Sequence, residues 1–180
     1  MQPTPTPPRV RALRTIALSY LGSIPLIGVV VALAVPGDHL WGAPDLLGIV
    51  APIVIGLACW AAVVTIGLRV PALPAGATDP VGAVTAYQTS LFVRIAFATL
   101  PALLSIPLLF VLPHATMITF AIGAVISLVL LAVYVYPHRY NAALVERRLD
   151  RAGGRSLLTT HLGLDGPQPP QDDTGSARFH

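Results

Sequence analysis

The chain has 180 residues, of which 54% are hydrophobic and only 11% are charged, and its mean hydropathy is +0.74. Soluble domains usually carry about 25% charged residues, so this composition excludes an ordinary water-soluble globular protein and predicts an integral membrane protein. The formal net charge is +3, and the length favours a single domain. All 11 basic residues are arginines, a bias typical of GC-rich bacterial genomes, and we therefore expect a bacterial source.

The N-terminal segment, residues 1–14, is rich in proline and threonine and ends in several arginines. We expect it to form a disordered basic arm. The apolar run that follows, residues 15–35, is the first predicted membrane helix, although Ala32-Leu33-Ala34 resembles a signal-peptide cleavage site. The apolar region of a signal peptide usually has about 7–15 residues, and this run is longer. Its length favours a retained helix and leaves cleavage as the alternative.

Three further apolar runs cover residues 46–68, 91–112 and 115–135. Each is long enough to cross a bilayer, which requires about 20 residues. None of the runs alternates apolar and polar residues, and this argues against a transmembrane β-barrel. The sequence therefore predicts an all-α integral membrane protein, in which residues 15–136 form an antiparallel bundle of four transmembrane helices.

The segment between the second and third runs contains a helix start that precedes the membrane. Pro71, Pro74 and Gly76 predict an irregular chain at first. Asp79 followed by Pro80 is typical of a helix N-terminus. The aspartate side chain accepts hydrogen bonds from the unpaired backbone amides of the first turn, and proline suits the first helical position. A third helix beginning near Pro80 would be about 50 Å long, so its first turns should lie at the membrane interface.

After the fourth run the chain becomes charged, and residues 137–164 are predicted to form an amphipathic segment. A helix is expected over about residues 139–152, where apolar positions share one face, and Gly153-Gly154 should end it. Residues 165–180 are rich in glycine, proline, glutamine and aspartate, a composition that predicts a disordered tail.

The placement of the arginines predicts the orientation. The arginines outside the spans lie before the first run, at Arg69 after the second run and beyond the fourth run, whereas the two loops on the other side contain none. The chain is then expected in a bacterial inner (plasma) membrane. The positive-inside rule puts both termini and the amphipathic segment on the cytoplasmic side of that membrane. Basic residues beside a membrane attract the anionic lipids of its inner leaflet. The candidates for contact with anions or lipid headgroups in this segment are Arg139, Arg147, Arg148 and Arg151.

Within the four predicted spans Arg94 is the only charged side chain, and no Asp, Glu, His, Asn, Gln or Lys occurs there. Proton and ion carriers place carboxylates or histidines inside the bilayer, and hydrolases need a nucleophile with a base. The single cysteine, Cys59, excludes an intramolecular disulfide. We therefore expect no catalytic residue, cofactor or metal site. Arg94 should snorkel to the headgroups, and the alternative is that it faces the bundle and binds an anion.

Prolines and small residues inside the spans predict kinks and close helix contacts. The prolines within the predicted spans are Pro25, Pro52, Pro101 and Pro107. Each removes a backbone hydrogen bond, and without buried polar partners we interpret them as packing features rather than parts of a transport site. Small residues four positions apart allow helices to approach closely. Two such pairs are Ala58 with Ala62 and Gly123 with Ser127.

These features favour a non-enzymatic accessory or scaffolding subunit, whose partners are the anionic bilayer and another membrane protein or a second copy of the chain. The alternative is a small oligomeric transporter or channel subunit for an apolar or anionic solute, bound near Arg94. Acidic residues interrupt the basic C-terminal segment, and we expect no nucleic-acid binding because that requires a larger basic surface.

Overall fold

The computed structural model describes residues 8–35, 37–40, 42–136 and 139–161. The tail predicted for residues 165–180 lies outside these described residues, as do residues 1–7 of the predicted arm. Four described helices are long and apolar enough to cross a membrane, namely Arg11–Ala34, Leu46–Gly67, Val81–Val111 and Met117–Val135. They pack together, with short helices after them, which confirms the predicted all-α fold of a multi-pass membrane protein.

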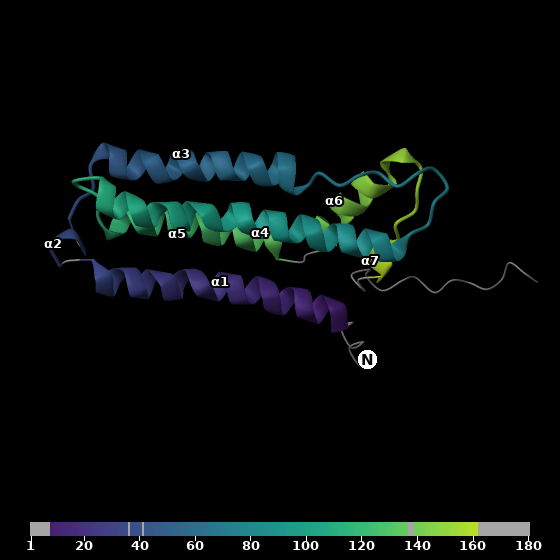
Figure 1. Ribbon diagram of the computed structural model, residues 1–180, viewed down its shortest axis with the longest axis horizontal. Helices are drawn as coiled ribbons and strands as arrows, with labels where there is room; N and C mark the ends of the chain where they lie inside the picture. The colour runs from purple at the N-terminus through teal and green to yellow at the C-terminus, as the bar shows by residue number, and fades with distance from the viewer. Residues whose placement is uncertain (1–7, 36, 41, 137–138, 162–180) are drawn as a thin grey trace, which may run out of the picture.

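The long helices run antiparallel to one another in chain order (Figure 1). They are α1 (Pro8–Ala34), α3 (Leu46–Ala62) with the π-helical turn η1 (Val63–Gly67), α4 (Pro80–Val111), and α5 (Met117–Leu130) with the π-helical turn η2 (Leu131–Val135). The short helix α2 (Gly37–Leu40) lies in the connection between α1 and α3. The C-terminal elements are α6 (Arg139–Leu149), the 3-10 turn η3 (Asp150–Ala152) and α7 (Leu158–His161). The end of the bundle at which α1 begins and α6 and α7 lie is called the α6 end below (Figure 1).

Two helix starts can be compared with the sequence. The third long helix begins at Pro80, and the side chain of Asp79 accepts a 2.8 Å hydrogen bond from the amide of Gly82, which confirms the predicted start. The first helix begins at Pro8, so the prediction of a disordered arm is wrong for residues 8–14. Proline suits a first helical position, and the buried side chain of Leu13 joins the core, which stabilises these turns as helix.

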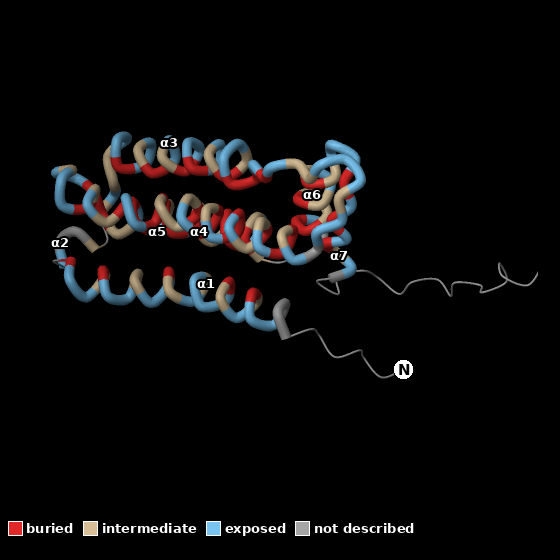
Figure 2. The backbone as a smooth tube through the Cα atoms, turned by 45° about the vertical axis from the view of Figure 1, so that its right-hand side comes forward, coloured by how far each residue is buried: buried red, intermediate tan, exposed pale blue. Residues whose placement is uncertain are grey.

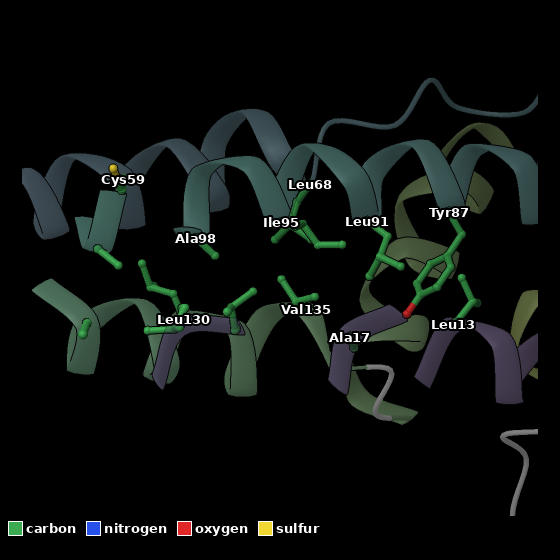
Figure 3. Packing of buried hydrophobic residues seen from close by; sticks show 14 of the residues in the cluster. Leu13, Ala17, Cys59, Leu68, Tyr87, Leu91, Ile95, Ala98, Leu130 and Val135 are labelled. Atoms are coloured by element: carbon green, nitrogen blue, oxygen red, sulfur yellow. The ribbon is translucent and has the colours of Figure 1, made fainter. Parts of the chain in front are cut away.

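The hairpin of α4 and α5 forms the centre of the bundle, and α1 and α3 pack on its sides. Figure 2 shows α1 exposed along its outer side and buried only at spaced positions that face the hairpin. In Figure 3, Tyr87 and Leu91 of α4 lie opposite Leu13 and Ala17 of α1. The outer apolar side chains, such as Leu33 with 84% of its surface exposed, are suited to contact with lipid rather than water.

The loop between η1 and α4 is fixed against the C-terminal elements. The amide of Leu73 donates to the carbonyl of Leu149 at 2.8 Å, and the amide of Arg155 donates to the carbonyl of Ala77 at 3.0 Å. Gly153 ends the C-terminal helical segment with a φ of 88°, a conformation that favours glycine. The loop, α6, η3 and α7 therefore form one small layer across the α6 end of the bundle.

Candidate functional site

The end of α3 is completed by side chains from two other helices. The last residues of a helix leave carbonyl groups without partners inside the helix. The hydroxyl of Ser90 on α4 donates to the carbonyl of Gly67 at 2.6 Å. The Nη1 of Arg148 on α6 donates to the carbonyl of Leu68 at 2.9 Å. Polar side chains at the α6 end thus supply the donors that the helix end lacks.

The end of α5 is completed in the same way. The Nη1 of Arg94 on α4 donates to the carbonyl of Tyr134 at 3.0 Å. The Nδ2 of Asn141 on α6 donates to the carbonyls of Val133 and Tyr136, at 2.9 and 3.1 Å. Both long helices that end beside α6 are therefore tied to their neighbours by side-chain to backbone hydrogen bonds.

Arg94 is completely buried, with 0% of its surface exposed. Its Nε donates to the carbonyl of Ser90 at 3.2 Å, and its Cζ lies 5.4 Å from the centroid of the Tyr87 ring. Gly67 leaves room for it, since a Cβ there would lie 2.6 Å from Cγ of Arg94. The expectation that Arg94 snorkels to the headgroups is therefore wrong, because its guanidinium turns toward the carbonyl of Tyr134 inside the bundle.

Arg94 and the neighbouring Tyr87 each bury one polar atom. Nη2 of Arg94 and Oη of Tyr87 are buried and have no hydrogen-bond partner among the residues that the structure describes. Buried polar groups are usually paired, and each exception invites a structural or functional explanation. The two atoms are the feature of the bundle interior that bears most directly on the transporter hypothesis.

An open pocket at the α6 end, the arginine pocket, has a volume of about 430 Å³. Its lining residues are Leu68, Arg69, Val70, Pro71, Arg148 and Arg151. Of the four C-terminal arginines that the sequence singles out, the structure brings Arg148 and Arg151 into this pocket. It adds Arg69, which sequence analysis used only to assign the orientation. Guanidinium groups bind carboxylate and phosphate oxygens through paired hydrogen bonds, so this arrangement can hold an anion.

Of the other two arginines that the sequence singles out, Arg147 does not line the pocket. Arg147 is exposed on α6, and the side chain of Arg139 lies outside the described residues. Of the small pair on α3, Ala58 is exposed and Ala62 is half-buried. The prolines Pro25, Pro52 and Pro107 lie inside α1, α3 and α4 respectively, each within a helix that continues past it.

The fourth proline, Pro101, lies where α4 touches α5. The amide of Ala102 donates to the hydroxyl oxygen of Ser127 at 2.9 Å, and the hydroxyl of Ser105 donates to the carbonyl of Pro101 at 2.7 Å. Gly123 faces this turn so closely that a Cβ there would lie 2.6 Å from the Pro101 carbonyl oxygen. The small pair Gly123 and Ser127 therefore sits at a close helix contact where serine hydroxyls bond to backbone groups around the proline.

A second, apolar hollow lies between α3 and α5 and is called the α3–α5 groove. Its volume is about 660 Å³, and its lining includes Gly56, Leu57, Trp60, Val125 and Ile126. A Cβ at Gly56 would lie 2.8 Å from Cγ2 of Ile126, so a larger residue there would require the Ile126 side chain to shift. The indole of Trp60 donates to the hydroxyl of Tyr134 at 3.0 Å.

Comparison with protein-family models, with curated proteins and with solved structures found no match to this chain. The functional assignment therefore depends on the geometry of the chain itself. That geometry consists of a buried arginine that ties helix ends together, an arginine pocket at the α6 end, and an apolar groove along two membrane-spanning helices.

Proposed function

We propose that this protein is a non-enzymatic accessory or scaffolding subunit of a bacterial inner membrane, which packs against another membrane protein or against a second copy of itself. The observation that carries this proposal is the α3–α5 groove, which has a volume of about 660 Å³ and contains Gly56 and Ala121 in its lining. Helices associate in a bilayer mainly by close packing at small residues, because lipid gives no hydrophobic driving force between them. A helix of a partner could fill this groove.

The hydrogen bonds that the buried polar side chains form with backbone groups support the same proposal. Ser90, Arg94 and Asn141 donate to backbone carbonyls, and Ser127 accepts from a backbone amide. Each of these groups therefore stabilises a helix end or a proline turn. This is the pattern expected of a rigid packing element, whereas a carrier would direct its polar groups toward a solute.

The proposal is tested by a photo-crosslinking amino acid placed in the groove in native membranes. Val125 lines the groove and is 58% exposed, and the matched control is Leu26 on α1, which is 65% exposed. We expect one protein, either a partner or a second copy, to crosslink from position 125 and to co-purify in mild detergent at a fixed stoichiometry. Mass spectrometry identifies the crosslinked chain.

The control position decides the interpretation. Position 26 should give no crosslink to the same protein, because it lies on another helix and outside the groove. Crosslinks to lipid alone from both positions, or equal protein crosslinking from both, would reject the groove as a packing surface and with it the scaffold proposal.

A transporter or channel subunit for an anionic solute is the second candidate. It is favoured by one observation, namely that the buried Arg94 and Tyr87 lie together and that Nη2 of Arg94 and Oη of Tyr87 each lack a well-formed hydrogen bond among the described residues. Ionisable groups inside membrane proteins often mark a solute pathway. Solute flux through proteoliposomes of the purified chain, abolished by Arg94→Met and retained by Arg147→Met, would favour this candidate over the scaffold.

We further propose that the α6 end faces the cytoplasm, because the arginine pocket lies there and basic residues favour the cytoplasmic side. The test is labelling of cysteines introduced one at a time, in spheroplasts, with a membrane-impermeant maleimide and with the unchanged chain as the background control. Ala43→Cys and Ala75→Cys place exposed thiols on opposite ends of the bundle, and the native Cys59 is only 7% exposed. We expect labelling of position 43 in intact spheroplasts and of position 75 only after permeabilisation. The reverse pattern would invert the topology.

A further inference from the structure

We propose that the arginine pocket binds a phosphate group, carried either by the headgroup of an anionic phospholipid or by free phosphate. This inference is independent of the scaffold proposal, because it concerns a different surface from the α3–α5 groove. It rests on the way in which two distant segments of the chain bring Arg69, Arg148 and Arg151 together around one opening.

The two walls of the pocket come from the loop after η1 and from the end of the C-terminal helical segment. Arg69 lies on the first wall, between the buried side chains of Leu68 and Val70. Arg148 and Arg151 lie on the second wall, three residues apart, a spacing that puts both on the same side of a helix. The pocket therefore has an apolar floor and guanidinium groups on both sides.

The two walls of the pocket are held together by hydrogen bonds within the chain. Nη1 of Arg148 donates to the carbonyl of Leu68 at 2.9 Å, which joins one wall to the other. A second hydrogen bond, from the amide of Leu73 to the carbonyl of Leu149, holds the loop against α6 at 2.8 Å. A guanidinium group has five N–H donors, so Arg148 keeps several for an oxyanion while it holds the loop. Such preorganisation lowers the entropic cost of binding, because the loop is already ordered.

The arginines of the pocket are not neutralised by ion pairs among the described residues. None of its arginines forms an ion pair with a carboxylate within the part of the chain that the structure describes. The three carboxylates of this layer each accept a hydrogen bond from a backbone amide, and that of Asp79 accepts from Gly82 at the start of α4. The side chain of Asp150 accepts from the amide of Ser156 at 2.7 Å, and the side chain of Glu146 accepts from the amide of Thr159 at 3.1 Å. An anion in the pocket would therefore supply the missing negative charge.

The position of the pocket and its donors favour phosphate as that anion. Leu68 follows directly after the membrane span Leu46–Gly67, so the opening lies at the depth where lipid headgroups are found. Arginine is the residue best suited to phosphate, since its planar donors can contact two oxygens at once. A volume of about 430 Å³ is sufficient for a phosphate together with the glycerol that carries it.

The test measures ligand binding to the purified full-length chain in detergent, by native mass spectrometry. The probes are dioctanoyl phosphatidylglycerol, dioctanoylglycerol without a phosphate, and inorganic phosphate. The pocket variant is Arg69→Gln with Arg151→Gln, both exposed residues, while Arg148 is kept because it holds the loop. The matched control is Arg147→Gln with Arg155→Gln, which removes the same charge from exposed positions outside the pocket.

We expect phosphatidylglycerol, and not dioctanoylglycerol, to bind the wild type, and the pocket variant to bind it about tenfold more weakly, as loss of charge-assisted hydrogen bonds predicts. The control should bind within about twofold of the wild type, since exposed charges act weakly. Binding of inorganic phosphate with the same dependence on the variants would support the site and identify free phosphate as the ligand. Equal weakening in both variants, or no binding of either phosphate probe, would overturn the proposal.

Discussion

Replacing Gly123 with alanine should destabilise the bundle more than the same change at Gly22 or Gly28 of α1. The added Cβ would lie 2.6 Å from the carbonyl oxygen of Pro101 and still closer to the hydroxyl of Ser105. The carbonyl belongs to the backbone of α4 and cannot move away as a flexible side chain would. We expect the free energy of unfolding to fall by about 1–3 kcal/mol, the usual effect of overpacking.

The matched control for this change is Gly22→Ala on α1, where an added Cβ would meet nothing within 4 Å. That variant should be neutral or more stable by up to about 1 kcal/mol, because alanine favours helix over glycine. Both variants are compared with the wild type by unfolding in mixed micelles. If Gly123→Ala were as stable as Gly22→Ala, the close contact between α4 and α5 would be refuted.

Hydropathy was sufficient to predict the membrane spans, because the thickness of the bilayer fixes how long an apolar run must be. The start of α4 was equally predictable, since Asp79 and Pro80 act within one helical turn. The start of α1 was not, because proline-rich composition suggested disorder, whereas the burial of Leu13 depends on packing against other helices. A cap that acts within one helical turn is therefore predictable from the sequence, whereas a helix start that is stabilised by packing against other helices is not.

The candidate site illustrates the same limit. A run of basic residues after the fourth span was visible in the sequence, yet the pocket needs Arg69, which is far from Arg148 in the chain. Their meeting depends on the path of the loop over α6. The pair Gly123 and Ser127 was found from its spacing, but Gly67 was not, because its role is to make room for a side chain on another helix. Sequence spacing reveals contacts along one helix and not the residues that face them.

The second large effect is expected at Arg94, where alanine should lower the free energy of unfolding by about 3 kcal/mol, within the range for large-to-small substitutions of buried residues. The change removes the donor to the carbonyl of Tyr134 and the contact with the ring of Tyr87. It also leaves a void against Gly67, whose missing Cβ makes room for the arginine side chain.

Methionine at the same position separates the void from the charge. Arg94→Met keeps most of the volume, since an unbranched thioether adapts to irregular spaces. It leaves the carbonyl of Tyr134 without the donor at 3.0 Å, but it also removes a buried cation that has no carboxylate partner among the described residues. Removing a buried charge that has no ion-pair partner relieves its desolvation cost, which offsets part of the lost hydrogen bond. We therefore expect the methionine variant to lose less than half of what the alanine variant loses in the same mixed-micelle unfolding measurement.

The comparison has a direct consequence for the role of this arginine. A methionine variant that is fully stable would mean that folding does not require the charge. A buried guanidinium whose Nη2 lacks a hydrogen-bond partner among the described residues would then need a functional explanation such as anion binding. A methionine variant as unstable as the alanine variant would make the hydrogen bond to Tyr134 the dominant contribution. If the alanine variant kept wild-type stability, Arg94 would not be packed inside the bundle at all, and the snorkelling orientation would be restored.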